Sequence, residues 1–131
     1  MRKGLKILLI VIAVLAALVI TAFLLMKNTA DKALANIVFE DIDMAQAQNG
    51  TYYGETDAGM VYVKVAVTVE NHGIKDIDIV EHRNGRGAKA EAITDTMIKD
   101  NSYNVDDVSG ATLSSRAIKS AVSKALKQSC S

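Results

Sequence analysis

The 131-residue chain contains no proline, no tryptophan and a single cysteine, Cys130. One cysteine cannot form a disulfide within the chain, and no spacing of cysteine and histidine typical of a metal site occurs. An exposed thiol near a frayed end and a bridge between two copies are the two interpretations of Cys130. We therefore expect neither an internal disulfide nor a metal site.

The chain also lacks an excess of charge of one sign, because 15 Lys and Arg balance 15 Asp and Glu. The charges are nevertheless unevenly distributed. Residues 1–32 carry a net charge of +4, whereas the rest has 10 basic against 14 acidic side chains. A protein that binds nucleic acid needs clustered cations to contact phosphates, and no basic stripe occurs here. The composition therefore predicts that nucleic acid is not a partner.

The run Ile7–Met26 is twenty residues long and contains no charge. At a rise of 1.5 Å per residue, a helix of this length spans about 30 Å, the thickness of the hydrocarbon core of a bilayer. A cleaved signal peptide is the competing interpretation, but its apolar region is usually about 7–15 residues long and ends at a small-x-small site. Here Thr21 and Ala22 are followed by the bulky Phe23–Met26. We therefore expect an uncleaved transmembrane anchor.

Basic residues are denser before this run than after it. Arg2, Lys3 and Lys6 precede the run. Lys27 and Lys32 follow it, and the negative charge of Asp31 offsets one of these two. Flanks rich in Lys and Arg stay in the cytoplasm. The sequence therefore predicts a single-pass protein of the cell membrane with an extracytoplasmic C-terminal domain. The expected parts are a cytoplasmic leader, a transmembrane helix, a juxtamembrane segment and a folded domain, at residues 1–6, 7–26, 27–48 and 49–128.

Alternation of apolar and polar residues predicts a sheet. In Met60–Glu70, valine occupies every second position from Val61 to Val69, which places five valines on one dry face of a strand. Asn71-His72-Gly73 is typical of a hairpin turn. Further strands are expected at residues 51–55 and 74–81, the latter with Ile77 and Ile79 on one face, and a turn at residues 56–59.

Apolar residues at helical spacing follow the expected sheet. Residues 89–99 and 114–127 each carry an apolar stripe of this kind. Residues 30–48 begin with the same spacing and should lead from the membrane into the domain. Residues 100–106 are polar and irregular, with a short extended piece at 103–105. The order of three strands and two helices predicts an α+β fold, in which helices pack on one face of a small antiparallel sheet after the N-terminal transmembrane helix.

The segment most informative about function is Asp106–Ser115, DDVSGATLSS, which leads into the last expected helix. Gly110 allows backbone conformations that other residues avoid, and four hydroxyls lie within seven positions. Helix starts present unpaired N–H groups that bind phosphate. The segment therefore indicates an anion site, with ordinary serine N-caps as the alternative. No lysine follows the glycine as in a P-loop, and no Gly-x-Gly-x-x-Gly fingerprint of dinucleotide binding occurs.

Three stretches resemble, in order, the FMN-binding domain family, which includes small flavoproteins and the flavin-bearing subunits of sodium-pumping NADH:quinone oxidoreductases and Rnf-type complexes. They are NGTYYGE at Asn49–Glu55, the valine strand with its hairpin ending at Glu81-His82, and, most specific, VSGATLSS at Val108–Ser115. The segment HRNGRGAKAEAI at His82–Ile93 is also similar to single-domain members. The resemblance covers about residues 42–126 and implies FMN as the cofactor, held by residues 49–128.

In this family, a Ser-Gly-Ala-Thr-x-Thr motif can carry FMN covalently, because a flavin transferase joins the FMN phosphate to the last threonine. That position is Ser114 here, and a serine hydroxyl can form the same phosphoester. The resemblance therefore implies FMN at this loop, either covalent or noncovalent, with the cofactor-binding residues Ser109, Gly110, Ala111, Thr112, Leu113, Ser114 and Ser115. It places a second, basic loop near the cofactor, with the candidates His82, Arg83, Gly85 and Gly87; a solvated loop is the alternative.

Other candidates for chemistry are weaker. Tyr52, Tyr53 and Tyr62 could stack on a flavin ring. Tyrosines on short strands are more often half-buried packing residues, so these three are weak candidates. Asp76 and Asp78 alternate along a strand and fit a wet face better than a catalytic pair. No set of nucleophile, base and acid is apparent in the sequence, so no catalytic residue is assigned.

These observations predict an electron carrier, in which the cofactor performs the redox chemistry while the protein holds, orients and tunes it. Besides the membrane, the expected partners are redox proteins and, for covalent binding, a flavin transferase. A flavin-free or flavin-sensing binding or assembly module of the same fold is the alternative. An oxidoreductase acting on its own small substrate is a third hypothesis.

Overall fold

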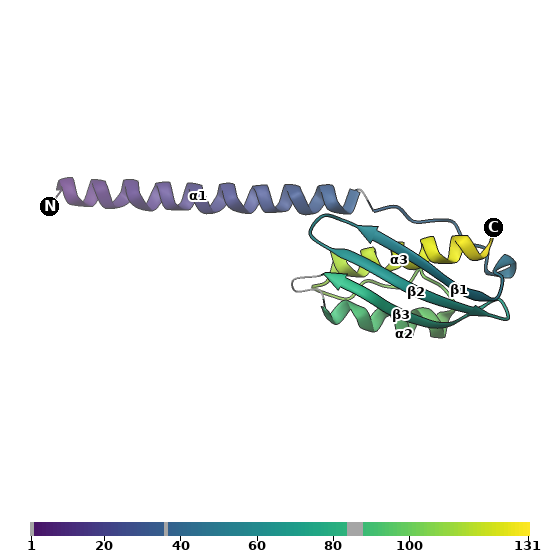
Figure 1. Ribbon diagram of the computed structural model, residues 1–131. Helices are drawn as coiled ribbons and strands as arrows, with labels where there is room; N and C mark the ends of the chain where they lie inside the picture. The colour runs from purple at the N-terminus through teal and green to yellow at the C-terminus, as the bar shows by residue number, and fades with distance from the viewer. Residues whose placement is uncertain (1, 36, 84–87) are drawn as a thin grey trace. The chain divides into compact units, whose positions relative to one another are not determined.

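The computed structural model describes the backbone of residues 2–35, 37–83 and 88–131 (Figure 1). It divides the chain into two units, residues 1–32 and 33–131, each of which is described by itself. The described residues of the first unit belong to helix α1, Arg2–Ala35. This helix contains the uncharged run Ile7–Met26 and is long and apolar enough to cross a membrane. The helical prediction for that run is confirmed.

The second unit contains a three-stranded antiparallel sheet in the order β1-β2-β3. Strand β1 is Gly50–Asp57, β2 is Tyr62–Glu70 and β3 is Gly73–Arg83. All three predicted strands are present. The turn expected at residues 56–59 begins later, because Thr56 and Asp57 continue β1 opposite Val63 and Tyr62.

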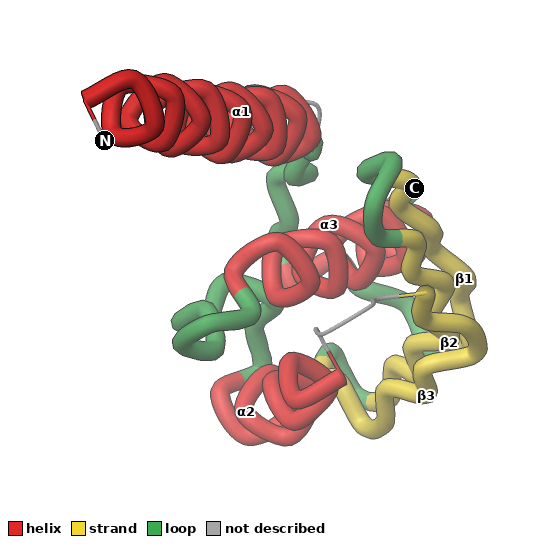
Figure 2. The backbone as a smooth tube through the Cα atoms, turned by 90° about the vertical axis from the view of Figure 1, so that its left-hand side faces the viewer, coloured by secondary structure: helices red, strands yellow, loops and turns green. Residues whose placement is uncertain are grey.

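The sheet packs its valine face against helices. Helix α3, Thr112–Ser129, contacts β1 and β2, and helix α2, Ile93–Asp100, contacts β3. A short 3-10 helix, η2, Ala88–Ala92, precedes α2. Both helices lie on the same side of the sheet (Figure 2). The predicted α+β fold, with helices on one face of an antiparallel sheet, is therefore confirmed.

The core lies between this sheet face and α3. The alternate valines of Met60–Glu70 are at most 4 % exposed, and burying a valine side chain contributes about 1.5–3 kcal/mol. The predicted inner face of α3 is fully buried against them, with Ala117, Ile118, Ala121, Val122, Ala125 and Leu126. Helix α3 also buries polar residues that the apolar pattern does not select, which are Ser114, Ser115, Lys119, Ser120, Ser123 and Ser129.

The β2–β3 hairpin has a two-residue turn. Asn71 and His72 both have positive φ, 53° and 61°, and Glu70 pairs with Gly73. Two positive φ values are typical of a type I′ turn, whose twist matches that of the flanking strands. The predicted hairpin is confirmed.

Two β-bulges change which residues of β3 face the helices. Val69 pairs with Ile74 and Thr68 with Asp76, so Lys75 is an extra residue, and the Lys64–Glu81 and Val65–Ile79 pairs leave Val80 extra. A bulge reverses the alternation of side chains beyond it. As a result, Ile74, Ile77 and Ile79 all pack on the core, and His82 lies opposite the buried Val63.

The segment between α1 and the sheet, residues 37–43, is not helical. The helix expected from residue 30 ends at Ala35, so the helical prediction is wrong beyond it; only residues 44–46 form a 3-10 turn. The segment instead bonds to α3. Ser123 Oγ accepts a hydrogen bond from the Glu40 N–H at 3.2 Å, and Ser120 Oγ donates one to the Val38 carbonyl oxygen. The buried serines of α3 thus satisfy backbone groups of this segment, whose own local spacing favoured a helix.

The outer edge of β1 is covered by side chains of α3. Gln128 Nε2 donates to the Tyr53 carbonyl oxygen at 2.6 Å, and Lys124 Nζ donates to the Glu55 carbonyl oxygen at 3.1 Å. These bonds occupy carbonyls that an open edge strand would offer to another chain. After α2, residues 102–111 form a loop without strand structure, so the extended piece expected at 103–105 is not a strand.

Candidate functional site

The start of α3 is joined to the preceding loop by a compact set of hydrogen bonds. Ala111 N–H donates to the Val108 carbonyl oxygen at 3.0 Å, and Ser115 N–H donates to the Ala111 carbonyl oxygen at 2.9 Å. Ser115 Oγ in turn accepts from the Val108 N–H at 2.9 Å. Gly110, between them, has a φ of +77°, which L side chains rarely adopt. The loop is therefore folded back on the first turn of the helix.

No side chain among the described residues caps this helix start. The N-cap residue is Ala111, which has no side-chain acceptor. The interpretation of the serines as ordinary N-caps is therefore wrong for this helix. The first N–H groups of an α-helix have no partner within it and carry a partial positive charge. Together with the exposed hydroxyls of Ser109 and Thr112, they offer donors to an anion.

A lysine from η2 lies over Gly110. A β-carbon added to Gly110 would lie 2.9 Å from Lys89 Nζ and 3.6 Å from Lys89 Cε. The ammonium group therefore stands beside the backbone of the glycine at the helix start. Sequence reasoning missed Lys89, which is 21 residues away in the chain, and only the contact of η2 with α3 brings the two together.

A second group of side chains meets at Ser114. The His82 side chain is 2 % exposed, with Nε2 3.3 Å from Ser114 Oγ and Nδ1 2.9 Å from Glu91 Oε1. Ser114 is also 2 % exposed. A serine, a histidine and a glutamate therefore form one connected chain, which is not apparent in the sequence. Sequence reasoning missed Glu91, because β3, η2 and α3 each supply one member.

The other predicted residues of this loop differ in exposure. Ala111 is 6 % exposed and belongs to the core. Leu113 is partly buried and packs on Ile37 and Ala58. Ser115 is fully buried and its hydroxyl is used by the loop. The structure thus brings the residues from Ser109 to Ser115 together with Lys89 and His82, and leaves Ser109, Gly110 and Thr112 at the surface.

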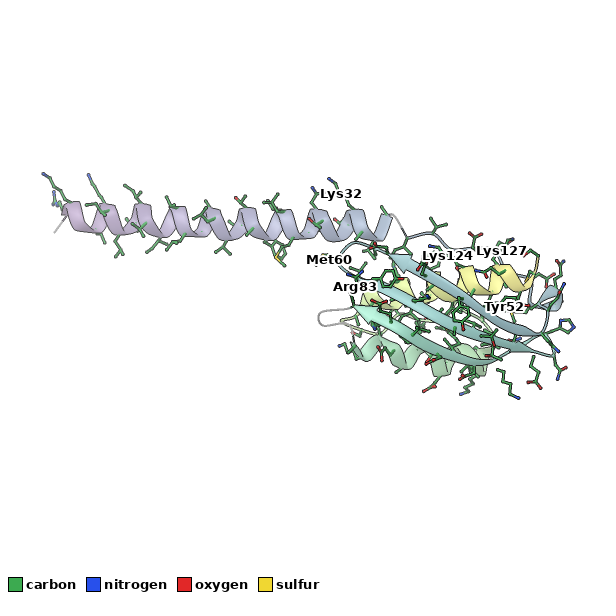
Figure 3. All side chains as sticks on the ribbon, in the orientation of Figure 1. Lys32, Tyr52, Met60, Arg83, Lys124 and Lys127 are labelled. Atoms are coloured by element: carbon green, nitrogen blue, oxygen red, sulfur yellow. The ribbon has the colours of Figure 1, made fainter. Side chains whose placement is uncertain are left out.

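The predicted basic loop is only partly at this site. Arg83 follows His82 on β3 and its guanidinium lies 4.9 Å from the ring centroid of Tyr62, whose hydroxyl donates to Glu55. Successive strand residues point to opposite faces, so Arg83 lies away from the helices. Tyr52 is at the opposite end of the sheet from Arg83 (Figure 3). Gly85 and Gly87 lie outside the described residues.

Asp107 anchors the loop that precedes the site. Its carboxylate oxygens lie 3.1 Å from Arg116 Nε and 2.8 Å from Lys119 Nζ, and Lys119 also donates to the Val105 carbonyl oxygen at 3.0 Å. Burial acts to raise the pKa of Asp107, but the hydrogen bonds and charges of Lys119 and Arg116 hold that pKa below its ordinary value. The ion pairs of Asp107 with Arg116 and Lys119 therefore fix the loop before α3 to the helix.

This arrangement fits the phosphate end of a flavin mononucleotide. It combines a helix start, a glycine at positive φ, surface hydroxyls and a lysine ammonium, which are the groups that hold phosphate in proteins. No group of three or more acidic, cysteine or histidine residues suited to a metal ion occurs in the described part of the chain.

Comparison with known proteins gives one match. The family model described as the FMN-binding domain matches residues 58–127, slightly more than half of the chain. The match begins directly after β1, ends in the last turn of α3 and includes residues 109–115. No curated protein and no solved structure matches the chain. The chain therefore belongs to the FMN-binding domain family, and its cofactor is FMN.

Proposed function

We propose that this chain is a membrane-anchored electron carrier that holds FMN outside the cytoplasm. The observation that carries the proposal is the position of Lys89 over Gly110 at the start of α3, within the segment matched by the family. Bound FMN supplies reversible electron transfer, and the protein positions and tunes it. The residues of the chain have to bind the phosphate, orient the cofactor and anchor the domain.

The FMN phosphate binds where the loop 109–112 meets α3. Gly110 leaves room for close approach of an anion to the backbone, because it has no side chain and adopts a φ of +77°. The N–H groups of the first turn and the hydroxyls of Ser109 and Thr112 donate hydrogen bonds. Lys89 contributes the positive charge that complements the phosphate.

The site is held ready before the cofactor arrives. Asp107 fixes one side of the loop through Arg116 and Lys119, and Ser115 fixes the other side through the Val108 N–H. A loop that is already ordered loses less conformational entropy on binding. The ion pairs and the buried hydroxyl therefore increase the affinity for FMN without touching it.

The domain arrangement supports a carrier tied to the membrane. Helix α1 is long enough to cross a bilayer, and the cations before Ile7–Met26 favour a cytoplasmic leader and an extracytoplasmic domain. We place the leader, the anchor and the FMN-binding domain at residues 1–6, 7–26 and 49–128. The hydrogen bonds of Val38 and Glu40 to α3 favour treating the segment after α1 as part of the same folded body.

A flavin assay on the full chain in detergent tests the site. Purified wild type should contain about one flavin per chain, and Gly110→Val should lose most of it while keeping the circular dichroism of the sheet and helices. Gly59→Val is the matched control, because Gly59 also has positive φ, +79°, but belongs to the turn after β1. Equal flavin contents in the two variants would contradict the proposed site.

The carrier role is tested separately in membranes. The visible absorbance of the bound flavin should bleach when a physiological reductant is added and return when an acceptor is supplied. The Gly110→Val chain should show neither change. A wild-type flavin that exchanges no electrons with any membrane component would contradict the carrier role and leave FMN binding intact.

A further inference from the structure

Four hydroxyls surround the start of α3, and one of them differs from the rest. Among the described residues, the Ser114 hydroxyl alone of the four has an imidazole nitrogen within hydrogen-bond distance, with His82 Nε2 at 3.3 Å. The Ser115 hydroxyl accepts from the Val108 N–H instead, and Ser109 and Thr112 are exposed. A serine hydroxyl is a weak nucleophile unless a neighbouring base takes its proton. Ser114 has such a base in place.

The other nitrogen of His82 is also engaged. Nδ1 lies 2.9 Å from Glu91 Oε1. A carboxylate at this position keeps the proton on Nδ1 and leaves Nε2 free of hydrogen, so that Nε2 can accept the proton of the serine. The His82 side chain and residue Ser114 are each 2 % exposed, so their contact is shielded from water. A hydrogen bond in such a low-dielectric environment is stronger than one in water.

A β-bulge in β3 turns the His82 side chain toward the helices. Regular alternation from Ile77 and Ile79 would point residue 82 to the open face of the sheet. The extra residue Val80 shifts the register, so that His82 lies opposite Val63 on the helix side. β-Bulges often redirect a side chain next to a functional site, and here the redirected side chain meets Ser114.

We propose that His82 is the general base for covalent attachment of FMN to Ser114, and that Glu91 is a positioning residue that orients His82. This inference rests on the proposed function, because it concerns the same FMN site. In this proposal, the protein that receives the flavin supplies the general base itself, and the flavin transferase does not have to supply it.

The step is a phosphoryl transfer. The donor is flavin adenine dinucleotide, which is bound by a flavin transferase. Ser114 Oγ forms a bond to the phosphorus of the FMN half while the bond from that phosphorus to the adenylate oxygen breaks. Adenosine monophosphate leaves with the electron pair of that bond, and the Ser114 proton moves to His82 Nε2. No atom is oxidised or reduced.

The product is stabilised by the same residues. The new phosphodiester is an anion, and the protonated imidazole beside it is a cation that also faces the Glu91 carboxylate. The transferase has to open the buried Ser114–His82 contact to reach the hydroxyl. The proposal requires that His82 moves with Ser114 during this opening, so that the base that touches the Oγ atom stays within reach of its proton.

The rate of attachment tests the proposal. The full chain in detergent is incubated with purified flavin transferase and flavin adenine dinucleotide, and attached flavin is followed by its fluorescence in denatured samples. His82→Asn should lower the rate constant by about 10²–10⁴-fold, the contribution of general acid–base catalysis. The affinity for added FMN in the absence of the transferase is measured alongside, so that any change in binding is separated from the change in the rate of attachment. His72→Asn is the matched control, because His72 lies in the β2–β3 turn and Asn tolerates its positive φ.

Chemical rescue separates a base from a structural contact. Added imidazole should restore attachment in His82→Ala, since it fills the space of the missing ring, and should leave the wild-type rate unchanged. Glu91→Gln should slow attachment less than His82→Asn does, and Glu91→Asp should recover part of the loss. A His82→Asn rate equal to wild type, or a slow His82→Ala that imidazole does not restore, would overturn the proposal.

The position and the form of the flavin distinguish this inference from the proposed function. Mass spectrometry should find the flavin on Ser114. Flavin on Thr112 or Ser115, or FMN that binds but is never attached when the transferase is present, would overturn the inference and leave FMN binding at this loop intact. Absence of any bound flavin in the wild type would contradict the proposed function itself.

Discussion

Gly54 of β1 lies against Ala121 of α3 so closely that the two backbones leave no room for a side chain. A β-carbon on residue 54 would overlap the Ala121 carbonyl oxygen and would lie 2.8 Å from the Ala125 backbone nitrogen. Because these neighbours are backbone atoms of a helix, a rotamer change cannot relieve the overlap. The glycine thus sets the distance between α3, which carries the proposed FMN site, and the sheet beneath it.

Gly54→Ala should therefore destabilise the domain. Forcing a methyl group into such a contact costs about 1–3 kcal/mol or more, and each kcal/mol lowers the melting temperature of a domain this size by roughly 4–8 °C. Gly73→Ala is the control, because its β-carbon would meet the Glu70 carbonyl oxygen at an ordinary 3.4 Å. Thermal unfolding of the two variants gives the comparison. An unchanged melting temperature for Gly54→Ala would contradict the close contact.

Lys89→Gln should weaken noncovalent FMN binding. The ammonium lies beside Gly110, and a hydrogen bond to a charged group contributes about 1.5–3 kcal/mol. Lys89 is exposed, so solvent and salt screen part of this interaction. We therefore expect a loss of about 3–10-fold in affinity, about 1 kcal/mol, in a titration that follows flavin fluorescence.

The salt dependence of binding provides the control for Lys89. Raising the ionic strength should weaken FMN binding to wild type more than to Lys89→Gln. Lys99→Gln, an exposed lysine in the last turn of α2, should behave as wild type. If both lysine variants lost affinity equally, net charge rather than the position over Gly110 would explain the result.

Local patterns were sufficient to predict most of the fold. The valines of β2 fill one face, Asn71-His72 forms the turn, and the apolar stripe of α3 is buried where expected. Each of these features depends on residues close together in sequence, such as alternation along a strand or spacing along a helix. The family match over residues 58–127 includes the segment Val108–Ser115, for which the sequence predicts a phosphate site.

The features that sequence did not predict depend on distant contacts. Val80 is one extra residue in the pairing of β3 with β2, and no local pattern marks it, yet it determines that His82 faces the helices. Lys89 and Glu91 become site residues only because η2 packs on α3. The segment after Ala35 was expected to be helical because its spacing is helical, but its backbone bonds to Ser120 and Ser123 of α3 instead.

The predicted orientation in the membrane can be tested with single thiols. In a Cys130→Ser background, Asp76→Cys introduces an exposed thiol on β3, and Gly4→Cys introduces one in the leader without removing a cation. A membrane-impermeant maleimide added to intact cells should label residue 76 and not residue 4, because the more basic flank stays in the cytoplasm. Labelling of residue 4 alone would show the opposite orientation.

The charged cluster at Asp107 predicts a dependence of stability on pH. The pKa of Asp107 is lowered in the folded protein by Lys119 and Arg116, against the effect of burial. A carboxyl with a depressed folded pKa stabilises the fold above its unfolded pKa of about 3.9 and loses that contribution as pH falls through the folded value. Asp107→Asn should therefore be less stable than wild type at neutral pH, by about 1–3 kcal/mol. The difference should begin to shrink below about pH 4 and should vanish once the pH is below the folded pKa of Asp107. Asp106→Asn, at the exposed neighbouring position, is the control. Denaturant unfolding at several pH values measures the difference, and a constant gap from neutral to acidic pH would show that Asp107 acts through its shape rather than its charge.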